Sequence, residues 1–181
     1  SSNTTAVFQL ESRGMKDMLK QAKPDCFEDI VALVALYRPG PMDLIPDFCR
    51  RKHGQQSVTY PHPATESILK ETYGIAVYQE QVMQACVVLG GMSMGKANKV
   101  RKVIGKKQDA AGLDKYKKEF VDGATKHIGA TYAKEMWSDF EKHAGYSFNK
   151  SHAVAYSMLS YWTAWLKAHY PLSFMYSVFK Y

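Results

Sequence analysis

The chain has 181 residues, of which 46% are hydrophobic, and its formal net charge is +7. This length and composition suit one folded domain with a core, and they exclude a chain that is disordered throughout. The excess of positive charge favours a polyanionic partner.

Apolar spacing predicts helices along almost the whole chain. The fold class we expect is therefore mainly α: an irregular multi-helix domain over residues 1–181, with at most one short strand, near the N-terminus at 6–10. The expected helices cover about 27–37, 43–53, 64–71, 77–89, a basic segment that follows Ser93, 113–128, 133–144 and 151–169.

The last of these segments, 151–169, is apolar nearly all round, which is typical of a helix at the centre of a core. We expect the aromatic residues of this helix to be buried: Tyr156, Tyr161, Trp162 and Trp165. Its apolar stretch is shorter than the roughly 20 residues that a bilayer requires, so no membrane span is predicted.

The ends of the chain and its cysteines give two further expectations. The chain has no initiator methionine and stops inside a helical pattern, so we expect a piece of a longer protein. Cys26, Cys49 and Cys86 are far apart and odd in number, which predicts neither a zinc site nor a disulfide framework. A reducing compartment fits best, and we expect a cytoplasmic protein.

The segment Gly90–Lys96 has the glycine and lysine spacing of a phosphate-binding P-loop. Such a loop needs a preceding strand and a Ser or Thr after the lysine to hold magnesium. Here Ala97 follows the lysine, and the segment before Gly90 has helical spacing. A helix–turn–helix joint is therefore the favoured interpretation.

Six basic residues and no acid occupy positions 96–107. On a helical wheel the lysines share one broad arc, Ala97, Val100, Val103 and Ile104 form a neighbouring apolar face, and Arg101 lies on the far side of that face. Most runs of this kind are simply solvated helix faces. Without interspersed acids to neutralise it, however, this run is also typical of phosphate binding.

The segment Asn149–His152 precedes the long helix. Asn149 or Ser151 can cap that helix, which is the simple structural interpretation. A helix N-terminus also favours anions, and Lys150 and His152 would add donors there, so the same segment is a candidate contact to a phosphate or a base.

Other motifs are weaker. Two SxxK matches, at Ser93 and Ser147, lack the partner motifs of penicillin-recognising hydrolases. No histidine pair has metal-binding spacing and no carboxylate constellation stands out, so we predict no catalytic residue and no metal ligand in the chain. Gln79 and Gln81, beside aromatic residues, could line a groove, although glutamines are common on helix surfaces.

Six stretches, in order and covering nearly the whole chain, resemble the alpha subunits of bacterial replicative DNA polymerase III, the C-family of DNA polymerases. They are TTAVFQLESRGM (4–15), PDCFEDIVALVALYRPGPM (24–42), ETYGIAVYQEQVM (71–83), VRKVIGKK (100–107), GYSFNKSHAVAY (145–156) and WLKAHYP (165–171).

The resemblance implies that the chain is the fingers region, a helical domain that closes over the incoming nucleotide. The partners implied are template–primer DNA, dNTPs and, in the parent protein, the sliding clamp and other replisome subunits. The family's catalytic aspartates and Mg²⁺ belong to the palm, upstream of this chain, so the isolated fragment is expected to be inactive. Its residues would position the triphosphate and neutralise its charge.

Carried over by position, the family motif that faces the triphosphate falls on Arg101 and Lys102, where the second residue is usually arginine. Lysine keeps the charge but loses bidentate geometry. The implied phosphate contacts are Arg101, Lys102, Lys106, Lys107, Lys150 and His152. A second set of candidate contacts to DNA or nucleotide is Lys96, Lys99, Arg38, Gln79, Gln81, Asn149 and Ser151.

Two other functions stay open on the residues alone. One is a non-enzymatic helical nucleic-acid-binding module, which would bind DNA through 96–107 without a response to dNTP. The other is a small hydrolase of the SxxK type, which would be acylated at Ser93 or Ser147.

Overall fold

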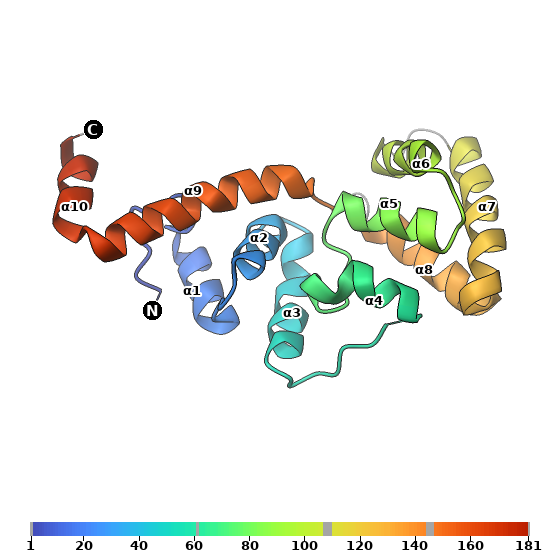
Figure 1. Cartoon of the computed structure of the whole chain (residues 1–181), viewed down its shortest axis with the longest axis horizontal. Helices are drawn as coiled ribbons and strands as arrows, with labels where there is room; N and C mark the ends of the chain where they lie inside the picture. Colours follow the sequence, from blue (N-terminus) through green and yellow to red (C-terminus); the bar gives the residue numbers. More distant parts are fainter. Residues whose placement is uncertain (1, 61, 107–109, 144–146, 181) are drawn as a thin grey trace.

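A computed structural model describes residues 2–60, 62–106, 110–143 and 147–180. In these ranges the chain is mainly helical, and no strand is present (Figure 1), so the predicted fold class is confirmed. The helices are α1 (Arg13–Ala22), α2 (Phe27–Leu36), η1 (Pro41–Leu44, a 3-10 turn), α3 (Ile45–Lys52), α4 (Pro63–Leu69), η2 (Lys70–Thr72, also 3-10), α5 (Gln79–Val88), α6 (Met94–Lys106), α7 (Ala110–Ile128), α8 (Ala130–His143), α9 (Lys150–His169) and α10 (Pro171–Lys180).

The segment 6–10 is not the short strand that its sequence suggests. The Val7 N–H donates to the Thr4 carbonyl at 3.0 Å, and the Leu10 N–H donates to the Val7 carbonyl at 3.1 Å. Ala6 and Gln9 have φ values of 63° and 61°, in the left-handed region, which no strand accommodates. Successive turns therefore replace the strand.

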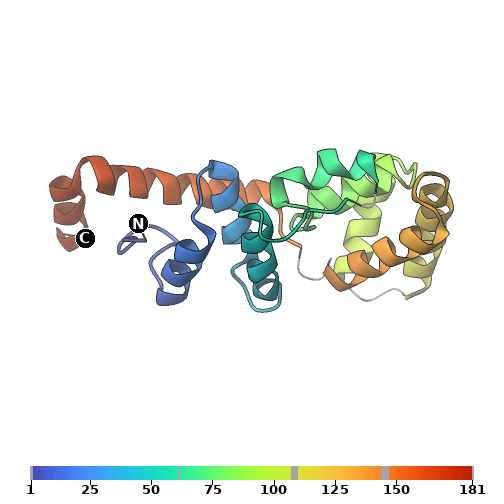
Figure 2. The same cartoon turned by 90° about the horizontal axis from the view of Figure 1, so that it is seen from below.

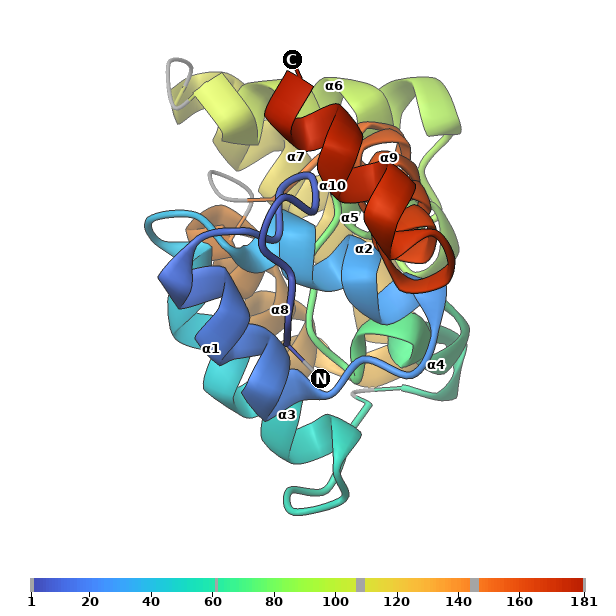
Figure 3. The ribbon, with the colours of Figure 1, turned by 90° about the vertical axis from the view of Figure 1, so that its left-hand side faces the viewer.

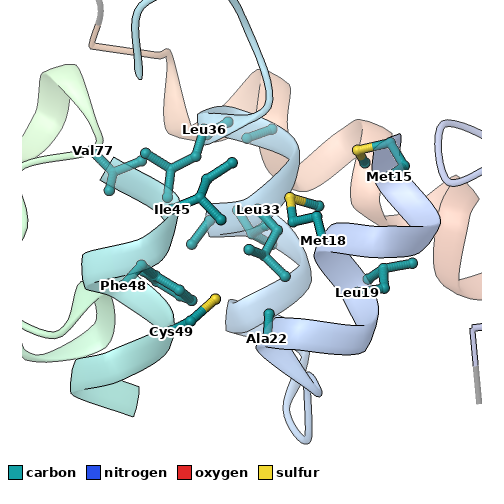
Figure 4. Packing of buried hydrophobic residues seen from close by; sticks show 14 of the residues in the cluster. Met15, Met18, Leu19, Ala22, Leu33, Leu36, Ile45, Phe48, Cys49 and Val77 are labelled. Atoms are coloured by element: carbon teal, nitrogen blue, oxygen red, sulfur yellow. The ribbon is translucent and has the colours of Figure 1, made fainter. Parts of the chain in front are cut away.

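The core consists of two hydrophobic clusters. The first joins α1, α2, α3 and Val77, with Leu33, Leu36 and Phe48 at its centre (Figure 4). The second lies among α4–α8 and is built around Trp137, Phe120 and Val100. Figures 1 and 2 show an elongated molecule with α10 at one end, α5–α8 at the other, and α1–α3 between them, while α9 runs along α2 toward α10.

Helix α9 is not at the centre of the core, and that prediction is wrong. Its buried positions are small, Ala153, Ser157 and Ser160, and they allow α9 to lie close on α2. The large apolar residues face outward: Trp162 is 51% exposed and Trp165 is 43% exposed. The exposed surface continues on α10, where Leu172 is 87% exposed and Phe179 is 83% exposed. Figure 3 shows α10 following α9 at the end of the molecule that faces the viewer. No helix in the described ranges has both the length and the apolar character to cross a bilayer.

The placement of the three tryptophans gives a prediction. Trp137 is fully buried, whereas Trp162 and Trp165 are about half exposed. We expect acrylamide to quench most of the fluorescence of the chain, because indole rings in contact with water are accessible to the quencher. A Trp162→Phe/Trp165→Phe variant should retain only blue-shifted, weakly quenched emission. If Trp162 and Trp165 were strongly shielded from acrylamide in a Trp137→Phe variant, the exposed position of α9 would be contradicted.

A buried ion pair connects α2, α3 and the end of η2. Asp29 accepts from the Lys52 ammonium at 2.8 Å, from the Tyr73 hydroxyl at 3.0 Å and from the Asp25 N–H at 3.2 Å. The side chains of Asp29 and Lys52 are only 1% and 5% exposed. Burial and the hydrogen bond to Asp29 raise the pKa of Tyr73 to about 12. Burial alone would lower the pKa of Lys52, but the bonds to Asp25 and Asp29 outweigh it and raise that pKa above its ordinary value.

These two pKa shifts predict a loss of stability at alkaline pH. The fold favours the protonated form of each group, so their contribution is fully present below the unfolded pKa values of 10.0 and 10.5. This contribution to stability is lost as pH rises through the pKa values that Tyr73 and Lys52 have in the folded state. Urea unfolding should therefore show stability falling between about pH 10 and 12, by linkage to these groups.

A Tyr73→Phe variant is the control for this pH dependence. The variant should be less stable at neutral pH, because it lacks the Tyr73 hydroxyl that donates to the buried Asp29 carboxylate. The loss of stability above pH 10 should be shallower in the variant than in the wild type. An equally steep decline in the variant would contradict the role assigned to Tyr73.

Candidate functional site

Helix α6 carries the basic residues, and its burial pattern follows the predicted wheel. Of the four predicted apolar positions, Ala97, Val100 and Ile104 are buried in the second cluster, and Val103 is half-buried. The Ser93 side chain caps the helix by accepting from the Lys96 N–H at 3.3 Å. Because one face is fixed in the core, the basic side chains project on either side of it.

Arg101 lies at the side of α6 that faces α5. Its NH1 donates to Gln79 Oε1 at 2.9 Å, and its Nε donates to Asn98 Oδ1 at 3.1 Å. Both acceptors are uncharged amide oxygens, so these bonds orient the guanidinium without neutralising it. Beside it lies an open pocket of about 370 Å³, lined by residues of α5, residues of α6 and Asn149.

The lysines of α6 have different surroundings. Lys96 is paired with Glu119 of α7 at 2.5 Å. A glutamate from another helix therefore neutralises part of the positive charge of residues 96–107. Lys99 and Lys102 are exposed, and neither side chain has an ion pair or hydrogen bond within the ranges that the structure covers. The side chain of Lys106 and the whole of Lys107 lie outside the described residues.

The segment 147–150 lies against the first turn of α5. The Phe148 carbonyl accepts from the Gln79 N–H, and the Phe148 N–H donates to Val77, both at 3.0 Å. The Gln79 amide also donates to the Ser147 carbonyl at 3.3 Å. Gln79 therefore contacts both Arg101 and this segment, and the structure brings these candidate residues together at one place.

Asn149, Lys150 and the His152 N–H, at the start of α9, already have partners in the protein. Asn149 caps the helix by accepting from the His152 N–H at 2.9 Å. Lys150 donates its backbone N–H to Glu80 at 3.0 Å and its ammonium to both oxygens of Glu71 at 2.7 Å. Ser151 and His152 are exposed, and the His152 ring lies 4.3 Å, centroid to centroid, from Tyr156.

Two of the remaining candidates, Gln81 and Arg38, make contacts within the fold. Gln81 is 3% exposed; its oxygen accepts from the N–H groups of Val77 and Tyr78, and its nitrogen donates to Ile68 and Thr72. Its placement is structural, and we do not retain it among the proposed contacts. Arg38 donates to the Ala35 carbonyl at 2.9 Å, and its guanidinium lies 4.4 Å from the centre of the Phe148 ring.

Sequence reasoning missed Glu71 and Glu80. Nothing in the local pattern connects these acids to Lys150, which follows 79 and 70 residues later. The contact between Asn98 and Arg101 could have been predicted from the sequence, because side chains three residues apart on one helix meet.

One group of possible metal ligands occurs in the described residues: Asp25, Cys26 and Asp29. The Lys52 ammonium already lies between the two carboxylates, at 2.5 and 2.8 Å. The cationic position of this cluster is therefore filled by the protein itself, and the cluster does not fit a magnesium site.

Comparison with known proteins identifies the family. The model of the bacterial DNA polymerase III alpha subunit finger domain matches residues 1–128. Proteins named DNA polymerase III subunit alpha are similar to the chain: that of Xylella fastidiosa strain Temecula1 is 57% identical over 176 residues, and that of Aquifex aeolicus is 53% identical over 174. The alpha subunit of Escherichia coli K12 is 50% identical over 185 residues.

These alignments include 97%, 94% and 98% of the chain, but the chain spans only about 15% of the length of these relatives. The family model covers residues 1–128, and the alignments to the relatives cover nearly the whole chain. The chain therefore belongs to the finger-domain family of the bacterial DNA polymerase III alpha subunit.

Proposed function

We propose that the chain is the fingers module of a bacterial-type replicative DNA-directed DNA polymerase, a cytoplasmic nucleotidyltransferase. In this proposal Arg101 binds the triphosphate of the incoming dNTP. The observation that carries it is the guanidinium of Arg101, fixed by two neutral amides beside an open pocket in a chain of this family.

Arginine suits this role because its planar fork binds phosphate oxygens in two places and never loses its charge at physiological pH. An arginine paired with a carboxylate would attract phosphate less. Gln79 and Asn98 instead supply orientation, so little side-chain freedom is lost when phosphate binds.

Lys99 and Lys102 are the proposed contacts to the phosphates of template–primer DNA or of the nucleotide. Both are exposed on the face of α6 away from the core. Each such contact releases counterions from DNA, so its contribution weakens as salt increases. Lys106 and Lys107 stay in the proposal on sequence grounds alone.

The parent enzyme would join the primer 3′-hydroxyl to the α-phosphate of the dNTP and release the β- and γ-phosphates as pyrophosphate, with two magnesium ions held by palm residues outside this chain. The fingers would position the triphosphate and stabilise its charge. No step of metal chemistry is assigned to the residues described here.

Nucleotide binding by the full-length polymerase that carries this chain tests the proposal. We expect the affinity for a dNTP, with magnesium and a primer–template, to be higher when the dNTP matches the template base than when it does not. DNA binding that no dNTP changes would instead favour a helical nucleic-acid-binding module without a nucleotide site.

A further inference from the structure

A carboxylate from α5 occupies the N-terminus of α9. Glu80 uses both oxygens: Oε2 accepts from the Lys150 N–H at 3.0 Å, and Oε1 accepts from the Asn149 side-chain amide at 2.9 Å. A helix N-terminus attracts anions, and here the attracted anion belongs to the protein.

A second carboxylate holds the side chain of the same residue. The Lys150 ammonium lies 2.7 Å from each oxygen of Glu71, and 5.4 Å from the centre of the Tyr78 ring. The two side chains of this pair are 37% and 31% exposed, so water reaches it only in part. With one lysine and two glutamates, the group has a formal charge of −1, so the charge of Lys150 is already offset within the protein.

The clamped turn is continuous with the support of Arg101. Glu80 follows Gln79 in the first turn of α5, and Gln79 holds the guanidinium of Arg101 at 2.9 Å. The turn that Glu80 anchors to α9 is thus the turn that orients Arg101.

We propose that Glu80 of α5 and Glu71 of η2, with Lys150, form a clamp that fixes the start of α9 and thereby positions Gln79 and Arg101 for the nucleotide. Lys150 is then a positioning residue and not a phosphate ligand. This inference rests on the proposed nucleotide contact of Arg101.

The test uses Glu80→Gln in the full-length polymerase, with KM for the template-matched dNTP and kcat measured separately. The glutamine has the same shape but presents an NH₂ group where one donor needs an acceptor. We expect KM to rise about tenfold, the effect of one lost charge-assisted hydrogen bond. If the carboxylate instead competed with phosphate for the α9 N-terminus, its removal would lower KM, and an unchanged or lower KM overturns the clamp.

A double variant shows whether the clamp acts through Arg101. In the Arg101→Ala background, Glu80→Gln should raise KM little further, because the Arg101 side chain that Glu80 positions is gone. An equal rise in both backgrounds overturns the proposal, since a general weakening of the fold acts regardless of Arg101. An Arg101→Ala polymerase with the wild-type KM would overturn the proposed nucleotide contact itself, and the positioning role with it.

Glu71→Gln repeats the test if Glu80→Gln fails to fold. It leaves the bonds of Glu80 in place and should raise KM about two- to fivefold, as expected for a partly exposed ion pair. A lower KM would mean that freed Lys150 binds phosphate, which overturns the assignment. Lys70→Met is the matched control: its side chain is 76% exposed, its nearest acid is 4.0 Å away, and KM should not change.

Discussion

Replacing Asp29 with alanine is expected to lower the free energy of unfolding of this chain by about 3–5 kcal/mol, the usual effect of breaking a buried ion pair. The substitution leaves the Lys52 ammonium inside the first cluster with one exposed partner. It also removes the acceptor of the Tyr73 hydroxyl and of the Asp25 N–H. Urea unfolding at neutral pH measures the change.

Asp25→Ala is the matched control, because Asp25 contacts the same ammonium at 2.5 Å but is 79% exposed. Its unfolding midpoint should stay close to that of the wild type. A second comparison adds Lys52→Met to Asp29→Ala, which removes the stranded charge and should restore part of the stability. If the double variant were no more stable than Asp29→Ala, the buried charge would not be the cause of the loss.

Replacing Arg101 with alanine should reduce kcat/KM for dNTP in the full-length polymerase by roughly ten- to a hundredfold. The reason is the loss of one charge-assisted contact worth about 1.5–3 kcal/mol. The effect should appear mainly in KM, because the guanidinium is proposed to bind the triphosphate when the nucleotide enters the site. Steady-state incorporation at varied dNTP concentration measures it.

Two variants sharpen this test. Arg101→Lys keeps the charge but not the fork, and should lose less activity than alanine. Lys126→Ala removes the same charge from an exposed position on α7 that lines no part of the Arg101 pocket, and KM should stay unchanged. A dNTP dependence unaffected by Arg101→Ala would refute the assignment of Arg101.

Local signals in the sequence were enough to predict most of the helices, though α1 and α10 were not among those expected, and to predict the buried face of α6. The period of Ala97, Val100 and Ile104 determines which side of that helix is buried, and this also separates Arg101 from the lysines. Such a pattern depends only on residues within a few turns of one another, which is why it can be read without the fold.

The partners of the charged residues were not predictable in the same way. Lys96 meets Glu119 and Lys150 meets Glu71, and each pair forms only when distant helices come together. Likewise, an apolar sequence indicates that α9 has surfaces able to be buried, but it does not say which of them another part of the molecule covers. The small residues on one side of α9 decided its orientation, and the large ones remained outside.

Helix α9 has a mechanical consequence. Its 20 residues form one unbroken rod, about 30 Å long, whose first turn is joined to Glu80. Its far half is tied to the N-terminal segment, where Thr163 accepts from the Phe8 N–H and the Lys167 ammonium donates to the Thr5 carbonyl. A tilt of about 5° around the middle of such a rod moves each end by about 1.3 Å. That displacement is enough to break a hydrogen bond of 3.0 Å, so a tilt of α9 is passed by the helix backbone to the Lys150–Glu80 bond, and from there through the first turn of α5 to Gln79 and Arg101.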